Sequence, residues 1–182
     1  NFTKTGYNFA GWATTANAGE AEHEDGKNVS NLTTEQNGTV NLYAVWKPIA
    51  YMVSFSGNGN DGGSMEDQTF RYDTEAPLRG NGNTRTGYHF LGWAKTASAQ
   101  VTYTDGASVN NLTATADDQI TLYAVWEANT YTVRFNANGG KGDQMASQSF
   151  TYDETVRALS KNTYTRENYT FLGWARTRNA TK

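Results

Sequence analysis

One eight-residue motif occurs three times in this chain at a constant spacing. Residues 6–13 read GYNFAGWA, residues 87–94 read GYHFLGWA, and residues 168–175 read NYTFLGWA. Two further markers recur with a period of about 80 residues, LYAVW at 42–46 and 122–126, and Tyr-x-Val-x-Phe at 51–55 and 131–135. A fixed period of this length indicates an array of like modules, which serves more often as a spacer, stalk or binding surface than as an enzyme.

The markers divide the chain into modules. Residues 1–46 form the back part of a first module, 51–126 a complete second module, and 131–182 the front part of a third. The linkers 47–50 and 127–130 reach at most about 13–14 Å when extended, which favours a semi-rigid array. Because the sequence begins and ends inside a repeat, we expect it to be a segment of a longer array. Its first and last parts complement each other, so natural ends would predict end-to-end self-association.

Alternating apolar and polar residues predict strands in each module. In the complete module these are residues 51–55, 68–72, 88–93 and 120–126, with 73–86 as an extended connection anchored by Leu78. Gly92 lies inside a predicted strand, where a glycine often marks a bulge. Val109 and Leu112 fit one short helical turn within 105–112. The predicted fold class is therefore mainly β or α+β, with a small sheet and at most one short helix per module.

Composition excludes several classes of function. The 182 residues carry 15 Lys and Arg against 18 Asp and Glu, a formal charge of −3, with no basic run to bind nucleic acid. Cys is absent, which excludes disulfides and thiolate metal sites. No apolar run approaches the ~18 residues of a membrane-spanning helix, so we expect no membrane insertion.

No catalytic residue, cofactor site or metal ligand is predicted. His23 and His89 stand at non-equivalent positions of the repeat, and the acidic stretch at 20–25 has no carboxylate pair at the matching place in the next copy. Acidic and amide side chains in the loops at 60–67 and 117–118 are oxygen donors suited to calcium. They lack the spacing of a known calcium loop, and turn chemistry is the simpler interpretation.

Aromatic residues make up 13% of the chain and recur at identical repeat positions. Each short module must build its own core, and large aromatics supply much of the buried area. The alternative is that Trp12, Trp93 and Trp174 are exposed and stack on sugars. The predicted structural framework comprises Tyr88, Phe90, Gly92, Trp93, Leu122, Tyr123, Trp126, Tyr131, Val133 and Phe135.

These motifs resemble the Listeria–Bacteroides repeat, the B-repeat of internalin-type bacterial surface proteins. The resemblance rests on residues 131–140 (YTVRFNANGG), 87–93 (GYHFLGW) and 122–126 (LYAVW), and it covers essentially the whole chain. It implies tandem β-grasp-like modules of a cell-wall-attached or secreted protein. Two departures stand out, because residues 57–61 read GNGND and Asn168 occupies a position where the family usually has glycine.

Three functional hypotheses follow. The first is a non-catalytic stalk or spacer of a bacterial cell-surface or secreted protein, which presents other domains and supports adhesion. The alternative is an adhesin or carbohydrate-binding module that uses exposed aromatics, and an enzyme ranks last. The expected location is extracellular, at the bacterial cell surface. Expected partners are neighbouring modules, and a host or bacterial surface protein or glycan, with no nucleic acid.

Overall fold

The computed structural model describes residues 2–178 of the chain, and the regular structure among them is entirely β. The described residues contain no helix. Contacts divide the chain into two compact units: unit 1 comprises Asn1–Arg85 and Phe90–Trp126, and unit 2 comprises Thr86–His89 and Glu127–Lys182.

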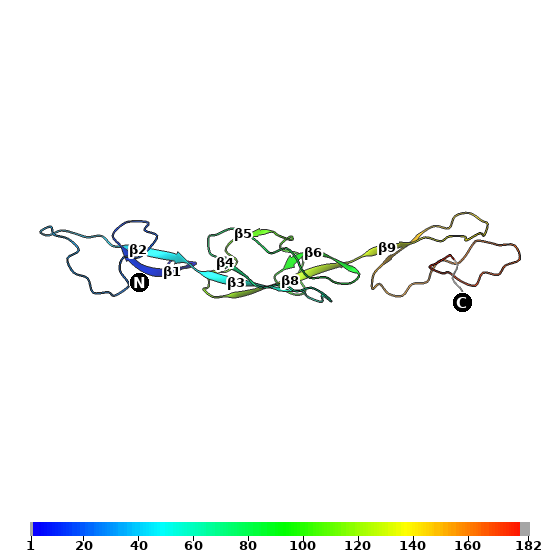
Figure 1. Ribbon diagram of the computed structural model, residues 1–182, viewed down its shortest axis with the longest axis horizontal. Helices are drawn as coiled ribbons and strands as arrows, with labels where there is room; N and C mark the ends of the chain where they lie inside the picture. The colour runs from blue at the N-terminus through cyan, green and yellow to red at the C-terminus, as the bar shows by residue number, and fades with distance from the viewer. Residues whose placement is uncertain (1, 179–182) are drawn as a thin grey trace. The chain divides into compact units, whose positions relative to one another are not determined.

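A mixed four-stranded sheet forms the centre of the second repeat. Its strand order is β4 (Gln68–Arg71), β3 (Ala50–Ser56), β8 (Gln119–Ala128) and β6 (Tyr88–Ala94). All four strands are labelled in Figure 1. Strand β3 is antiparallel to β4 and parallel to β8, with pairs running from Met52↔Gln119 to Ser56↔Tyr123. The first and last predicted strands of the module therefore lie side by side in its middle.

The alternation in β3 arises because one face of this strand lies on the core. Tyr51, Val53 and Phe55 are buried, while Met52 between them is 40% exposed. Side chains of a strand point alternately to opposite faces, so this register commits every second residue to the interior. The other buried side chains of the cluster come from β4, β6, β8, the short strand β7 (Ser108–Val109) and the residue after β5 (Ala76–Pro77): Phe70, Leu78, Trp93, Val109, Leu122 and Ala124.

Trp93 is the largest side chain of this core and is fully buried. Its ring lies 4.9 Å from that of Phe55 and 4.9 Å from that of Phe90, measured between centroids. The backbone of Trp93 is held by a hydrogen bond that Trp93 N donates to Tyr103 O, at 2.7 Å. Gly92 has a φ of +151°, and a Cβ there would lie 2.5 Å from the same Tyr103 oxygen. Only glycine permits residue 92 to lie this close to the Tyr103 carbonyl, and this backbone path places the Trp93 side chain in the core.

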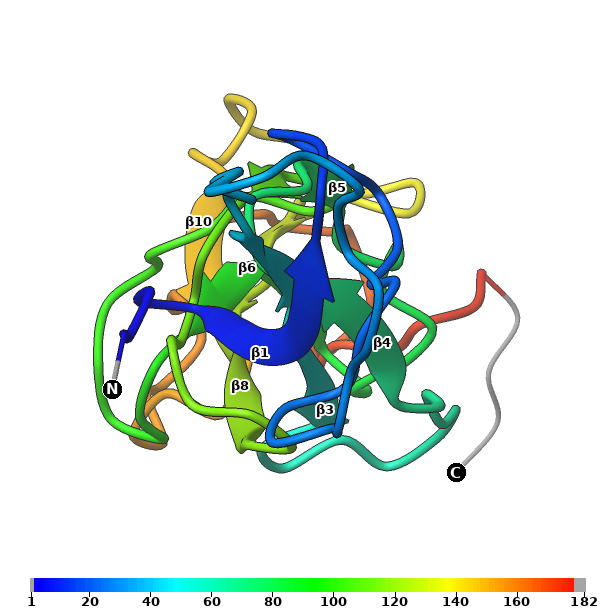
Figure 2. The same ribbon diagram turned by 90° about the vertical axis from the view of Figure 1, so that its left-hand side faces the viewer.

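The same arrangement of a glycine followed by a tryptophan occurs in the first repeat. It lies in the antiparallel pair of β1 (Tyr7–Ala13) and β2 (Tyr43–Pro48). The register shifts between Phe9 and Gly11, so β1 carries a bulge, and its ribbon bends sharply in Figure 2. Trp12 N donates to His23 O at 2.8 Å, as Trp93 N does to Tyr103 O. Bulged strands bend and twist locally, which explains why the glycine recurs beside the tryptophan.

The third repeat contains the hairpin of β9 (Thr130–Val133) and β10 (Gln148–Thr151), paired from Val133↔Gln148 to Thr130↔Thr151. Phe135 is buried and its ring lies 4.7 Å from that of Trp174. The third copy of the motif, residues 168–175, is nevertheless not a strand. In the second repeat the equivalent strand β6 pairs with β8, and among the described residues that follow β8 no strand takes its place to supply those hydrogen bonds.

The helical turn expected within 105–112 is wrong. Ser108–Val109 forms strand β7, which pairs antiparallel with β5 (Ala76–Pro77). Val109 is 4% exposed and packs into the core beside Leu78, so burial of an extended segment prevails over a weak helical spacing. The described residues thus show several small sheets and no helix in the place where the α+β alternative put one.

Replacing Trp93 with alanine is expected to lower the free energy of unfolding of the second repeat by about 3–5 kcal/mol, because it leaves a large cavity. Leu91→Ala is the matched control, since Leu91 lies on the same strand and is 42% exposed. It should change stability by no more than about 0.5 kcal/mol. Urea unfolding followed by far-UV circular dichroism measures both, and equal losses would contradict the assignment of Trp93 to the core.

Candidate functional site: the joint between repeats

The chain passes from one repeat to the next through a single residue outside the strands. Strand β2 ends at Pro48 and β3 begins at Ala50, while β8 ends at Ala128 and β9 begins at Thr130. The strands therefore continue into the segments 47–50 and 127–130 that the sequence suggested as linkers. Around each of these two residues, Ile49 and Asn129, the same backbone bonds, tyrosine pair and Tyr–Asp contact recur.

The first joint lies in unit 1 and consists of Gly6, Tyr7, Ile49, Tyr72, Asp73 and Asn111. Ile49 N donates to Gly6 O at 3.0 Å, and Tyr72 N donates to Ile49 O at 3.0 Å. The side chain of Ile49 is 3% exposed, so the residue that connects the repeats is also buried between their strands. Two backbone bonds through one buried residue fix the direction in which the chain leaves β2.

Polar side chains close the first joint. Tyr7 OH donates to Asp73 Oδ2 at 2.8 Å, and Asn111 Nδ2 donates to Asp73 Oδ1 at 2.7 Å. Asp73 N in turn donates to Asn111 Oδ1 at 2.6 Å. Asp73 has a φ of +55°, a turn conformation that Asp tolerates better than most residues. Both carboxylate oxygens are thus engaged from two different elements.

These hydrogen bonds shift the pKa of both ionisable partners. The bond from the Asn111 amide, and then that from the Tyr7 hydroxyl, lowers the pKa of Asp73 below its ordinary value of 3.8. The same bond to Asp73 raises the pKa of Tyr7 above 10.0, because ionised Tyr7 would lose its donor and face a carboxylate. Tyr7 is partly buried, whereas Asp73 is exposed, so solvent screens the interaction on the side of the carboxylate.

The second joint lies in unit 2 and consists of Gly87, Tyr88, Asn129, Tyr152 and Asp153. Asn129 N donates to Gly87 O at 2.8 Å, and Tyr152 N donates to Asn129 O at 2.8 Å. Tyr88 OH donates to Asp153 Oδ2 at 3.0 Å, and Asp153 has a φ of +58°. The second joint therefore reproduces the two backbone bonds and the Tyr–Asp contact of the first. The bonds between Asn111 and Asp73 belong to the first joint, and Asn129, unlike Ile49, is exposed.

An aromatic pair accompanies the hydrogen bonds in each joint. The rings of Tyr7 and Tyr72 meet edge-to-face with centroids 5.9 Å apart, and those of Tyr88 and Tyr152 do the same at 5.9 Å. Such pairs contribute about 0.5–1.5 kcal/mol beyond their buried area. His89, predicted to be an exposed strand residue, is exposed and lies beside the second joint, with Nδ1 2.9 Å from Asn129 Oδ1 and Nε2 3.1 Å from Glu127.

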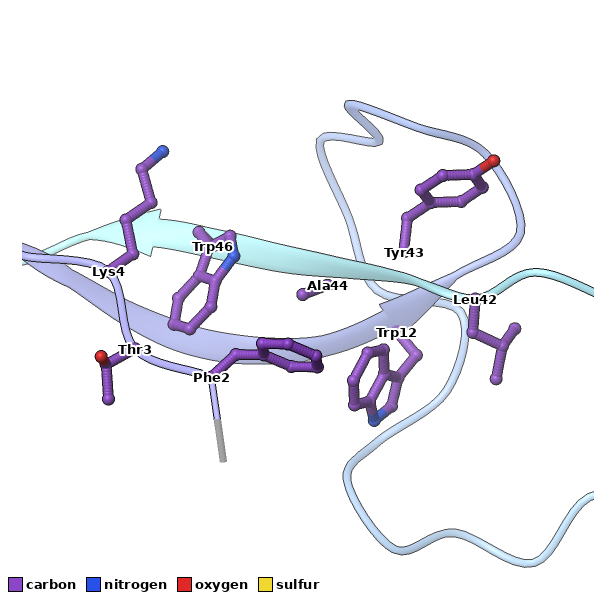
Figure 3. A pocket seen from close by; sticks show the side chains of 8 residues that line it. All are labelled: Phe2, Thr3, Lys4, Trp12, Leu42, Tyr43, Ala44 and Trp46. Atoms are coloured by element: carbon purple, nitrogen blue, oxygen red, sulfur yellow. The ribbon is translucent and has the colours of Figure 1, made fainter.

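A second candidate site is an aromatic groove of about 400 Å³ on the first repeat. Figure 3 shows the ring of Phe2 lying between Trp12 and Trp46 over strands β1 and β2. The groove is lined by Phe2, Thr3, Lys4, Trp12, Leu42, Tyr43, Ala44 and Trp46.

The groove is equivalent to the core face of the complete repeat. Trp12 and Leu42 hold the positions of Trp93 and Leu122, which β3 covers in the second repeat, where Phe55 packs on Trp93. No strand covers Trp12 in this way within the described residues 2–178. The groove therefore has the aromatic composition of a repeat interior, and Thr3, Lys4 and Tyr43 add polar groups to its lining.

The predicted framework residues fall into three settings. Trp93, Leu122 and Phe135 are at most 3% exposed, and Gly92 is also buried. Phe90, Tyr123, Trp126 and Val133 are partly buried, whereas Tyr88 belongs to the second joint and Tyr131 is 51% exposed. Trp12 and Trp174, the other tryptophans considered for sugar stacking, are partly buried.

The acidic stretch at 20–25 makes contacts within the first repeat. The carboxylate of Glu22 accepts hydrogen bonds from Thr14 N and Oγ1, and these bonds lower its pKa. Glu20 pairs with Lys47 at 2.8 Å.

Among the described residues, no three or more His, Cys, Asp or Glu side chains gather in a geometry that could hold a metal ion. Asp118, one of the loop acids considered for calcium, accepts a bond from Thr113 Oγ1 at 2.7 Å.

Sequence reasoning did not single out Asp73, Asp153 or Asn111 as joint residues. A signal was present, because the pair Tyr-Asp recurs at 72–73 and 152–153 with the period of the repeat. Alternation predicts the tyrosine as the last residue of a strand, although β4 and β10 end one residue before it, and it does not explain the aspartate that follows. An aspartate that recurs at the repeat period outside the strands indicates a contact that each repeat makes.

Asn111→Ala should raise the pKa of Asp73 toward its ordinary value, and Tyr7→Phe should do so to a smaller extent. Because the pKa is depressed in the folded joint, its contribution to stability is present above the ordinary value of 3.8 and is lost as pH falls through the depressed one. Carboxyl NMR titration of Asp73 measures the shift. The control is Asn110→Ala, an exposed neighbour, and a titration of Asp73 that is the same in all four proteins would contradict this geometry.

Comparison with known proteins identifies the repeats. The family model described as "Listeria-Bacteroides repeat domain" matches residues 1–45, 51–125 and 131–182. A protein of Evansella cellulosilytica named "Putative Gly-rich membrane protein" is 27% identical over 176 residues, which cover 96% of this chain and 20% of that protein. A second one from the same organism, named "Putative membrane protein", is 28% identical over 172 residues, which cover 94% of this chain and 24% of its own length.

The chain thus spans only about a fifth to a quarter of the length of these curated relatives. No solved structure matches. Within residues 2–178 no helix is long and apolar enough to cross a bilayer. The three matched segments repeat the same motifs and cover nearly the whole sequence, and the chain belongs to the Listeria–Bacteroides repeat domain family as three tandem copies.

Proposed function

We propose that this chain is a non-catalytic, tandem-repeat spacer of a bacterial cell-surface or secreted protein, which presents other domains of that protein and supports adhesion. The observation that carries the proposal is the joint. The same backbone bonds, tyrosine pair and Tyr–Asp contact occur at both passages between repeats. A connection that is repeated in this way would keep a constant distance between the domains attached to the two ends of the array.

Restriction of the chain at each joint supports a spacer over a flexible tether. A flexible linker is rich in Gly and Ser and makes few contacts. Here one residue separates consecutive strands, and in the first joint that residue is buried and bonded through both its N–H and its carbonyl. The entropy of the connection is therefore reduced by contacts that each repeat brings with it.

Placement at the cell surface is supported by the relatives. The names of both Evansella proteins describe them as membrane proteins, and each is several times longer than the matched region. A repeat array that occupies a fraction of a longer protein suits the role of a connecting segment. The mixed sheet with a parallel central pair, β3 and β8, supports the β-grasp-like character that we include in the proposal.

The alternative function is an adhesin or carbohydrate-binding module. The observation that favours it is the aromatic groove of the first repeat, because exposed tryptophans can stack on sugar rings. Against it, the equivalent Trp93 is fully buried and cannot contact a ligand. The groove also has the composition of the core face, so packing by another part of a repeat explains its aromatics without a sugar.

Small-angle X-ray scattering of the full chain tests the spacer. A single globule of this length has a radius of gyration of about 16 Å. A spacer should give a value well above that figure, with a pair-distance distribution skewed to long distances and unchanged over a tenfold dilution. A value near 16 Å would remove the spacer proposal.

A glycan array tests the alternative directly. We expect the full chain to bind no glycan, because Trp93 is buried in the core and Trp12 and Trp174 hold the equivalent positions of their repeats. Binding that disappears in Trp46→Ala but persists in the control Leu91→Ala would instead support a carbohydrate-binding function for the groove.

A further inference from the structure

The glycine of each joint lies against an aromatic ring. A Cβ built on Gly6 would lie 2.3 Å from Cδ1 of Tyr72, and one built on Gly87 would lie 2.2 Å from Cδ1 of Tyr152. Carbon atoms that are not bonded do not approach so closely, so a side chain at either position would displace the ring. The rings are the ones that form the edge-to-face pairs with Tyr7 and Tyr88.

These glycines also have a backbone conformation that most residues with a side chain avoid. Gly6 and Gly87 have φ values of +76° and +78°. Asn adopts positive φ more readily than other residues with a side chain. A replacement by Asn would therefore keep the turn and fill the space that the tyrosine ring occupies in the joint.

The third repeat carries this replacement. Asn168 stands where Gly6 and Gly87 stand, and its φ is +60°. The turn around it is that of the first repeat, because Tyr169 N donates to Arg166 O at 3.1 Å, as Tyr7 N donates to Lys4 O at 3.1 Å. The basic side chain also lies over the tyrosine ring in both, with Lys4 Nζ 3.6 Å and Arg166 Cζ 4.0 Å from the ring centroids.

We propose that the residue before the tyrosine of each repeat determines whether that repeat can form a joint with the Tyr–Asp turn of another repeat. Glycine at positions 6 and 87 permits the joint. Asn168 closes the corresponding surface of the third repeat, since its turn is retained while its Cβ occupies the place of the partner's ring.

The inference concerns the joint itself and does not depend on the spacer function, so its test uses a local readout. Gly87→Asn in the full chain places the residue of the third repeat in a working joint. The control is Gly106→Asn, because Gly106 has a φ of +66° and a Cβ there would meet nothing within 4 Å. Both substitutions place Asn at a positive φ, but only the one at position 87 lies against a tyrosine ring.

NMR gives two measurements of the second joint: nuclear Overhauser contacts between the rings of Tyr88 and Tyr152, and hydrogen exchange of the Asn129 amide, which donates to Gly87 O. We expect Gly87→Asn to abolish the ring contacts and to speed exchange of the Asn129 amide by about tenfold or more. Gly106→Asn should leave both unchanged. Retained ring contacts and protection in Gly87→Asn would overturn the proposal.

A rescue variant separates a clash from general unfolding. Tyr152→Ala combined with Gly87→Asn removes the ring that the new Cβ would meet, so protection of the Asn129 amide should return toward the value of Tyr152→Ala alone. Failure of this rescue, with the Trp93 core still folded by its fluorescence, would overturn the clash as the cause. Gly6→Asn repeats the test in the first joint, with the Ile49 amide as reporter.

Discussion

The complete repeat depends on the pairing of β3 with β8. These strands stand far apart in the sequence, and their five parallel pairs bring Phe55 over Trp93 and place β8 where it can pair with β6. The third repeat shows what is lost without it. Its Phe135 still meets Trp174, yet residues 168–175 form no strand, and Tyr169, Phe171 and Leu172 are all 49% exposed or more.

Much of the fold could be predicted from the sequence, because alternation directly reports which face of a strand is buried. The strands near 51–55, 88–93 and 120–126 follow this rule, and Gly92 beside Trp93 indicated a bulge that its counterpart in β1 shows. The short element at 108–109 could not be predicted in this way. Two residues carry no period, and only the burial of Val109 against the core decides that the segment is extended.

The joint was beyond prediction for a different reason. Its contacts join residues such as Tyr7 and Asp73, which neither local propensity nor hydrophobic pattern connects. Recurrence of Tyr-Asp at the repeat period was visible, but the partner of the aspartate becomes evident only from coordinates. The Gly-to-Asn difference at position 168 was also visible as a departure from the family pattern, and the neighbouring ring gives it a physical meaning.

The parallel neighbours β3 and β8 have a mechanical consequence. The chain enters the second repeat at the start of β3 and leaves it at the end of β8, and the two strands run in the same direction. Tension between these two points pulls the strands past each other along their length. All the hydrogen bonds between them then share the force at once, whereas peeling would break them one at a time. A tandem array of such repeats would therefore withstand more force than one whose paired strands peel apart.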